Sequence, residues 1–151
     1  EFITHSLIST TTASSRPIPS SLDSSAYQQD ADTKFMLKHL ADGSSFSQTD
    51  LSAVHSAYRD YIRQERIAVV DHRLVVFQPV QNNTELLMLI VVPQSLRRDI
   101  FSANHATPVA GHMGVYKALH RIRLRFFWPH SRKDVTNWVL QCLHCIAANG
   151  T

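Results

Sequence analysis

Two histidines and two cysteines in the last third of the chain constrain its fold more than any other feature. His105 and His112 stand seven positions apart, and Cys142 and Cys145 form a CxxC pair that begins thirty positions after His112. Histidine and cysteine are the ligands that zinc prefers, and a structural zinc site takes four of them in a tetrahedron. The pattern therefore predicts that the intervening sequence folds back and brings both pairs onto one Zn²⁺ ion.

A CxxC pair has other interpretations. In disulfide oxidoreductases it begins a helix after a strand, and the helix dipole lowers the thiol pKa. Here we expect the pair to close a helix, which favours zinc over a redox dithiol; unliganded core residues are the third alternative. His120, His130 and His144 lie near enough in the sequence to replace one of the four ligands. The spacing still favours the first four residues.

Composition limits the class of protein. Of the 151 residues 44% are apolar and 18% are charged, and no apolar run approaches the roughly 18 residues of a membrane span. We therefore expect a soluble protein with no membrane partner. Two cysteines three positions apart cannot link distant parts of a chain, and no secretory signal pattern is present. An intracellular, reducing compartment is expected.

The formal net charge of +3 conceals an asymmetry. Residues 1–95 contain seven Lys or Arg against ten Asp or Glu, a balance of −3, and residues 96–151 contain eight against two, a balance of +6. The basic part is the part with the predicted zinc ligands. A small basic domain indicates a polyanionic partner, most commonly nucleic acid.

Three segments are expected along the chain. Residues 1–26 contain twelve Ser or Thr and predict a flexible linker, because they cannot bury enough apolar surface to become ordered. Residues 27–93 predict an α+β extension with helices over about 26–40 and 48–64. Three strands follow at 67–70, 73–80 and 85–92, and their short connections indicate an antiparallel meander. Residues 94–148 predict a helical zinc-binding domain.

The helical domain is expected to be a three-helix bundle stabilised by zinc. Its first helix is capped by Ser95 and runs to His105, and the second places Val115, Leu119, Ile122 and Phe126 on one face. The Phe127-Trp128-Pro129 corner ends that helix. Ser131 and Asp134 then begin a third helix, which directs Cys142 to the core. The overall fold class is therefore α+β.

Basic side chains follow the second and third helices of this domain. They are the candidate nucleic-acid contacts: Lys117, Arg121, Arg123, Arg125, Arg132 and Lys133. No paired carboxylates, nucleophile with an adjacent base, or phosphate-binding glycine loop is present, and a zinc ion with four protein ligands has no open position for water. We expect neither catalytic residues nor a small-molecule substrate.

The pattern H-x6-H-x29-C-x2-C, with its internal Gly111-His112 and Phe127-Trp128-Pro129, resembles the HHCC (H2C2) zinc-binding domain of retroelement integrases. The resemblance is greatest to gypsy-like LTR retrotransposons, and residues from about 27 onward resemble the extension that precedes this domain in their polyproteins. One departure is that Ile146 to Thr151 lack the Gln and Lys that usually follow the second cysteine.

The resemblance implies a function in DNA integration. Integrases of this kind join element DNA to the host genome with a separate catalytic core, and their HHCC domain binds zinc, supports multimer assembly and contacts the DNA ends. His105, His112, Cys142 and Cys145 would be the ligands, and the parent protein would act in the nucleus. The alternative is a protein interaction module without a DNA role, with Phe126, Phe127 and Trp128 as its exposed patch.

Overall fold

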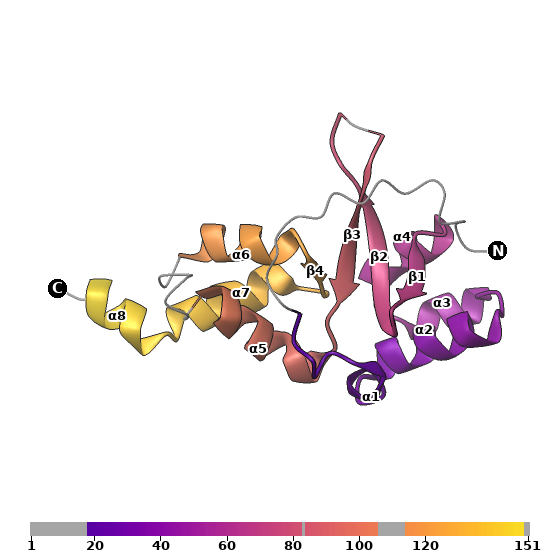
Figure 1. The fold of residues 1–151 in the computed structure, drawn as a ribbon, viewed down its shortest axis with the longest axis horizontal. Coiled ribbons are helices and arrows are strands. Elements are labelled where there is room, and N and C mark those ends of the chain that lie inside the picture. Colours follow the sequence, from indigo (N-terminus) through magenta and orange to yellow (C-terminus); the bar gives the residue numbers. More distant parts are fainter. Residues whose placement is uncertain (1–17, 83, 106–113, 150–151) are drawn as a thin grey trace.

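The computed structural model describes residues 18–82, 84–105 and 114–149. Within these ranges eight helices pack around a four-stranded mixed sheet, so the expected α+β class is confirmed. Figure 1 shows helices α2 to α4 beside one edge of the sheet and α5 to α8 beyond the other. Leu22, inside the predicted linker, is fully buried.

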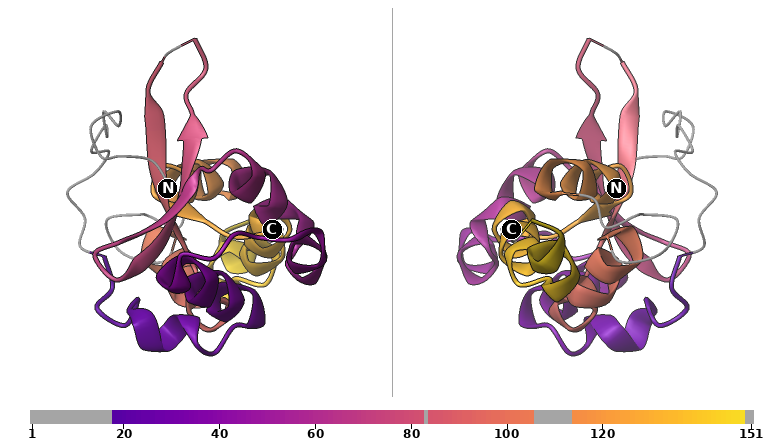
Figure 2. Two further views of the ribbon diagram at one scale, coloured as in Figure 1. Left: turned by 90° about the vertical axis from the view of Figure 1, so that its right-hand side faces the viewer. Right: turned by 90° about the vertical axis from the view of Figure 1, so that its left-hand side faces the viewer.

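Three consecutive strands form most of the sheet. They are β1 (Ile67–Val70), β2 (Arg73–Pro79) and β3 (Leu86–Val91), and each pairs antiparallel with the next. Asp71 and His72 connect β1 to β2 with φ angles of 51° and 63°. Two positive φ angles give a connection whose twist matches that of the strands. The β2–β3 hairpin extends beyond the helices in both views of Figure 2.

A fourth strand comes from the second half of the chain. β4 (Phe126–Phe127) pairs parallel with β3, and the Ile90 N–H donates to the Arg125 carbonyl at 2.7 Å. The expectation that Phe126 belongs to the preceding helix is wrong, because α6 (Val115–Arg123) ends before it. A two-residue strand is too short to show a period of its own. The second half of the chain thus completes the sheet of the extension.

The helix expected over 26–40 is two helices, α1 (Ser24–Tyr27) and α2 (Ala31–Asp42). Asp30 separates them, and its side chain accepts from the first backbone N–H groups of α2. Gly43, at φ 66°, ends α2 in the left-handed conformation. The apolar spacing continues across this break, which explains why the sequence pattern does not reveal it.

The helix expected over 48–64 is also divided, into α3 (Gln48–Ala53) and α4 (Ser56–Arg63). Val54 is extended and buried between them. The Nδ1 atom of His55 accepts from the Ala57 N–H at 3.0 Å and caps α4. A histidine cap has no strong sequence signature, since Ser, Thr, Asp and Asn are the usual N-cap residues.

In the residues that the structure describes, the second half forms four helices instead of the expected three. α6 packs against both α5 and α7. The buried apolar side chains of both halves belong to one continuous core, with Trp128 and Tyr58 among its largest members. The predicted boundary at residues 93/94 stays a prediction, although this core crosses it. The bounds of the other helices in this half are α5 (Gln94–His105), α7 (Ser131–Leu140) and α8 (Leu143–Asn149).

Candidate metal centre

Three of the four predicted ligands converge. The ligand atoms of His105, Cys142 and Cys145 all lie within 4.8 Å of one another. His105 is the last residue of α5, Cys142 follows α7, and Cys145 lies in α8. The fourth predicted ligand, His112, lies outside the described residues. The fold therefore brings a histidine and a CxxC pair together from positions 40 residues apart.

The donor geometry fits a zinc ion. A tetrahedral zinc with bonds of about 2.1 Å to nitrogen and about 2.3 Å to sulfur holds those two atoms about 3.6 Å apart. The Cys145 Sγ and His105 Nε2 atoms are separated by 3.4 Å. Two thiols and an imidazole are also donors that zinc prefers over oxygen ligands. The residues present match zinc in both chemistry and spacing.

Aromatic packing positions the histidine. His105 is 1% exposed, and its ring stacks on Phe101 with centroids 4.8 Å apart and an interplanar angle of 19°. Phe101 in turn contacts Trp138 of α7, and the Arg98 guanidinium lies over both aromatic rings. Because residues four apart share a helix face, α5 places Phe101 beside His105. This packing restricts the orientation of the imidazole.

The CxxC pair begins a helix and does not close one. The expectation from the sequence was wrong here, because the seven residues of α8 are too few to show a helical period. The element before the pair is the helix α7, whereas a thioredoxin-type site follows a strand. Desolvation and the neighbouring Cys142 thiol raise the pKa of the Cys145 thiol above its ordinary value. A zinc ion must therefore displace thiol protons.

Among the described side chains, His120 and His130 are not in the metal group, and the side chain of His144 lies outside the description. The Nε2 atom of His130 is instead 3.1 Å from the Nε2 atom of His55. Neither alternative ligand that the structure describes is thus near the converging cysteines and His105.

Comparison with known proteins identifies this part of the chain. Residues 92–151 match the family model of the integrase zinc binding domain. This segment is similar to integrase zinc-binding domains. The resemblance inferred from the histidine and cysteine spacing is thereby confirmed. The match begins at Val92, two residues before α5, and includes all three converging ligands. No solved structure matches the chain.

The integrase zinc-binding domain is a non-catalytic module, and its metal is zinc. None of the described helices, in this domain or in the extension, is long and apolar enough to cross a membrane.

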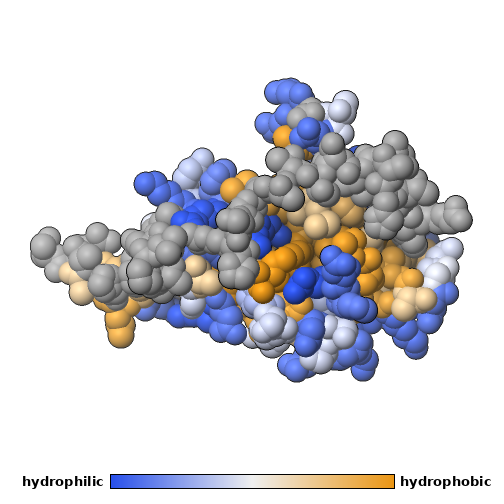
Figure 3. All heavy atoms as spheres, in the orientation of Figure 1, coloured by the Kyte–Doolittle hydropathy of each residue, from blue (hydrophilic) through white to orange (hydrophobic). Residues whose placement is uncertain are grey.

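The basic residues of the domain fall into two groups. Lys117, Arg123, Arg132 and Lys133 are exposed, on α6 and in the first turn of α7. Arg121 and Arg125 are partly buried, and the Arg125 guanidinium lies 5.4 Å from the Phe126 ring centroid. Hydrophilic side chains cover the outer side of α6 in Figure 3. Five of the six candidate contacts lie on α6 or α7, and Arg125 lies beyond the end of α6.

α7 begins at Ser131, as the sequence predicted. His130 is the N-cap residue, with φ 61° and no capping hydrogen bond from its side chain. Asp134 accepts a hydrogen bond from the indole Nε1 of Trp128 at 3.0 Å. Trp128 is 1% exposed, so this bond satisfies a buried donor. Asp134 therefore fixes the aromatic corner to the helix that precedes Cys142.

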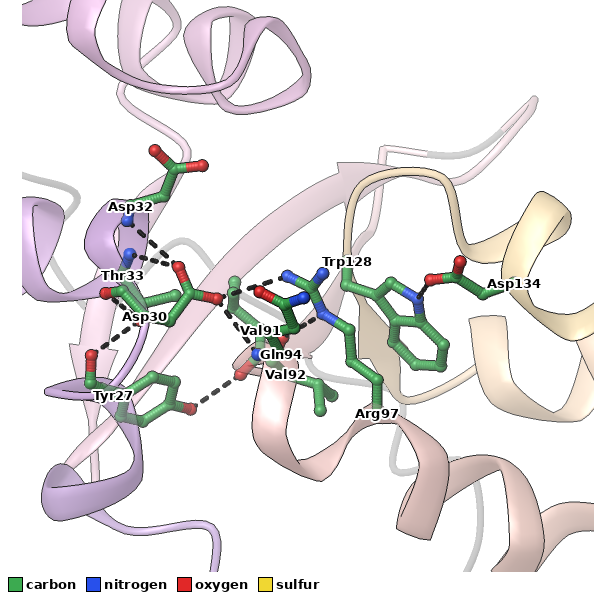
Figure 4. A network of polar contacts seen from close by, with 10 residues as sticks. All are labelled: Tyr27, Asp30, Asp32, Thr33, Val91, Val92, Gln94, Arg97, Trp128 and Asp134. Atoms are coloured by element: carbon green, nitrogen blue, oxygen red, sulfur yellow. Dashed lines mark hydrogen bonds and ion pairs between the residues drawn. The ribbon is translucent and has the colours of Figure 1, made fainter.

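A polar network that the sequence did not reveal joins the extension to α5 (Figure 4). Asp30 Oδ2 accepts from the Gln94 N–H at 3.1 Å and from Arg97 Nη2 at 3.4 Å. Arg97 Nε also donates to the Val92 carbonyl at 3.0 Å. Both of these partners lie more than sixty residues from Asp30 in the sequence. The network sets the start of the helix that ends at His105.

Proposed function

We propose that this chain is the non-catalytic N-terminal region of an LTR retroelement integrase of the gypsy-like group. In this proposal it comprises the extension and the integrase zinc-binding domain, helps to bind the ends of element DNA and assists multimer assembly in the nucleus. The convergence of His105, Cys142 and Cys145 within a segment that matches the integrase family is the observation that carries it.

Zinc would be held by His105, His112, Cys142 and Cys145. With four protein ligands the ion has no position for a reacting water, so its contribution is structural. It cross-links the end of α5 to the start of α8. Structural zinc in small domains supplies about 10 to 16 kcal/mol of apparent binding free energy, which acts as folding energy.

Charge and exposure support a DNA role. The domain half of the chain has a balance of +6, and four of the six candidate contacts are exposed. Arg132 and Lys133 lie in the first turn of α7, where the helix dipole adds positive potential. Phosphate oxygens are the ligands that such a surface attracts.

Exposed apolar side chains near the zinc site support self-association. Leu140, Leu143 and Ile146 are 67%, 82% and 50% exposed, at spacings of three residues around the start of α8. Apolar side chains protrude at this end of the molecule in Figure 3. Burial of such side chains against a second copy would remove them from water.

Zinc binding is tested by elemental analysis and chelation. The purified chain should contain one zinc, and chelation should reduce its helical circular dichroism signal. His112→Ala should reduce zinc content, and His120→Ala, at an exposed position on α6, is the matched control. Equal zinc content in the two variants would remove His112 from the ligand set.

DNA binding is tested by fluorescence anisotropy across a salt series. If the four exposed cations neutralise phosphates, the logarithm of the association constant should fall with the logarithm of salt concentration at a slope of about −3 to −4. A flat response would favour the alternative, a zinc-stabilised protein interaction module without a DNA role.

The patch first expected for that alternative does not fit. Phe126 and Trp128 are 4% and 1% exposed, so they belong to the core. A protein partner would have to contact another apolar surface, such as Leu140, Leu143 and Ile146. The alternative therefore predicts that polar substitutions at these three positions abolish partner binding and leave zinc content unchanged.

A further inference from the structure

A cavity of about 360 Å³ lies where the extension meets the zinc-binding domain. Ala57 of α4 and Gln78 of β2 line it from the extension, and Arg123, His130 and Arg132 line it from the domain. Both halves of the chain must be in place for the cavity to exist. It is separate from the converging cysteines and His105, none of which lines it.

The electrostatic character of the cavity favours an anion. Arg123 and Arg132 contribute two guanidinium groups, and no Asp or Glu is among the lining residues. Both arginines are exposed, and in the described part of the chain neither forms a salt bridge. Guanidinium groups bind phosphate through paired N–H donors, and two of them on one cavity can hold a single phosphate group.

The remaining lining favours a ligand with a flat apolar part. Phe127 and Pro129 contribute apolar surface beside the two arginines, and Gln78 offers an amide that can both donate and accept hydrogen bonds. Small-molecule sites span about 300 to 1,000 Å³, so this cavity is near the lower limit. It has room for one nucleotide but not for a duplex.

The two histidines at the boundary hold the cavity wall in one arrangement. Because His55 Nδ1 accepts the Ala57 N–H, the neutral ring carries its proton on Nε2 and donates it to His130 Nε2, 3.1 Å away. A neutral His130 then carries its proton on Nδ1. The contact connects the start of α4 to the start of α7, two helices that both line the cavity.

We propose that this cavity binds one unpaired nucleotide at the end of a DNA molecule, with the phosphate between Arg123 and Arg132 and the base against the apolar wall. The inference rests on the proposed DNA role and makes it more specific. It places the recognition of a frayed or single-stranded end at the junction of the extension and the zinc-binding domain.

The test measures anisotropy of the full, zinc-loaded chain with three labelled probes. They are a blunt duplex and the same duplex with two unpaired thymidines at either the 5′ or the 3′ end. At least one overhang should bind about fivefold more tightly than the blunt duplex, the lower limit of the gain from one stacked base. Equal affinity for all three probes would overturn the inference and leave the proposed DNA role intact.

Two pairs of variants locate the effect. Arg123→Gln/Arg132→Gln should lose the preference for the overhang, whereas Lys117→Gln/Lys133→Gln removes the same charge from the same two helices outside this cavity and should keep it. Ala57→Leu narrows the cavity without a charge change and should also lose the preference. Ala53→Leu, at an exposed position on α3, is its control.

Circular dichroism and zinc content establish that each variant is folded. A preference that survives in both cavity variants would contradict the assignment of the cavity. Absence of binding to every probe by the wild-type chain would reject the DNA role itself, together with this inference.

Discussion

The carboxylate of Asp30 accepts a hydrogen bond from the backbone N–H of Gln94, with 3.1 Å between the two atoms. Its other oxygen accepts from the Asp32 N–H at the start of α2. One side chain thus satisfies N–H groups at the beginnings of two helices that are more than sixty residues apart in the sequence. The first helix belongs to the extension, and the second ends at His105.

We predict that Asp30→Ala lowers the free energy of unfolding by about 2 to 4 kcal/mol, because it removes a helix cap and leaves the mostly buried Arg97 guanidinium without its carboxylate. Urea denaturation of the zinc-loaded chain measures the loss. Asp42→Ala, at the exposed end of α2, is the control. Equal stability of the two variants would show that the contact between Asp30 and α5 is not important for folding.

Zinc affinity should depend strongly on pH. The pKa of Cys145 is raised, so at neutral pH its thiol is protonated and zinc competes with a proton. Affinity should therefore increase with pH, by roughly tenfold per pH unit for each thiol displaced. Competition with a chromophoric chelator at pH 6.5, 7.5 and 8.5 measures this dependence. An affinity unchanged across that range would mean that the cysteines do not bind the metal as thiolates.

The stability of the protein at alkaline pH should depend on the buried hydroxyl of Tyr27. This hydroxyl donates to the Val91 carbonyl at 2.9 Å, and burial raises the pKa of Tyr27 to about 12. A raised pKa means that the group's contribution is complete below the unfolded value of about 10 and is lost as pH rises towards 12.

The Tyr27→Phe variant should be less stable than wild type by about 1 to 2 kcal/mol at pH 8. The difference should decrease between pH 10 and pH 12. Urea midpoints measured for both proteins across that range provide the comparison, and a difference independent of pH would argue against the burial of this hydroxyl.

The stability that the capping box of α3 contributes should decrease at acid pH. The Ser47 backbone N–H and hydroxyl, followed by His39, hold the pKa of Asp50 below its ordinary value. A lowered pKa contributes stability above the unfolded value of about 3.9, and the contribution is lost as pH falls through the folded value. Ser47→Ala should therefore be less stable than wild type at pH 6, with a smaller difference at pH 3. Thermal unfolding at both values measures it, with Ser45→Ala as the control.

Local signals were enough to predict part of this structure. The strands were placed to within about one residue at each end, because apolar and β-branched runs bounded by turn residues are local properties. The Ser47 and Asp50 capping box of α3 is likewise a local feature, since both partners lie within four residues. The spacing of the histidines and cysteines predicted a metal site of four residues. The structure brings three of them together, namely His105, Cys142 and Cys145.

Features that depend on distant contacts were not predicted. β4 forms only because β3 offers an edge to Phe126 and Phe127, and neither residue signals this by itself. The Asp30 contact with Gln94 and the His55 contact with His130 join residues more than sixty positions apart. The cavity is lined by both halves, so no single segment of the sequence contains its pattern.

The parallel pairing of β4 with β3 has a consequence for how the extension and the zinc-binding domain can be exchanged. The family match begins at Val92, but β3 ends at Val91 and pairs with β4. A recombination event at residue 92 would give the zinc-binding domain a new β3 and a new partner for Phe126. Only extensions whose last strand presents a compatible edge at Ile90 and Val91 could be combined with this domain, so the two modules are expected to have been inherited together.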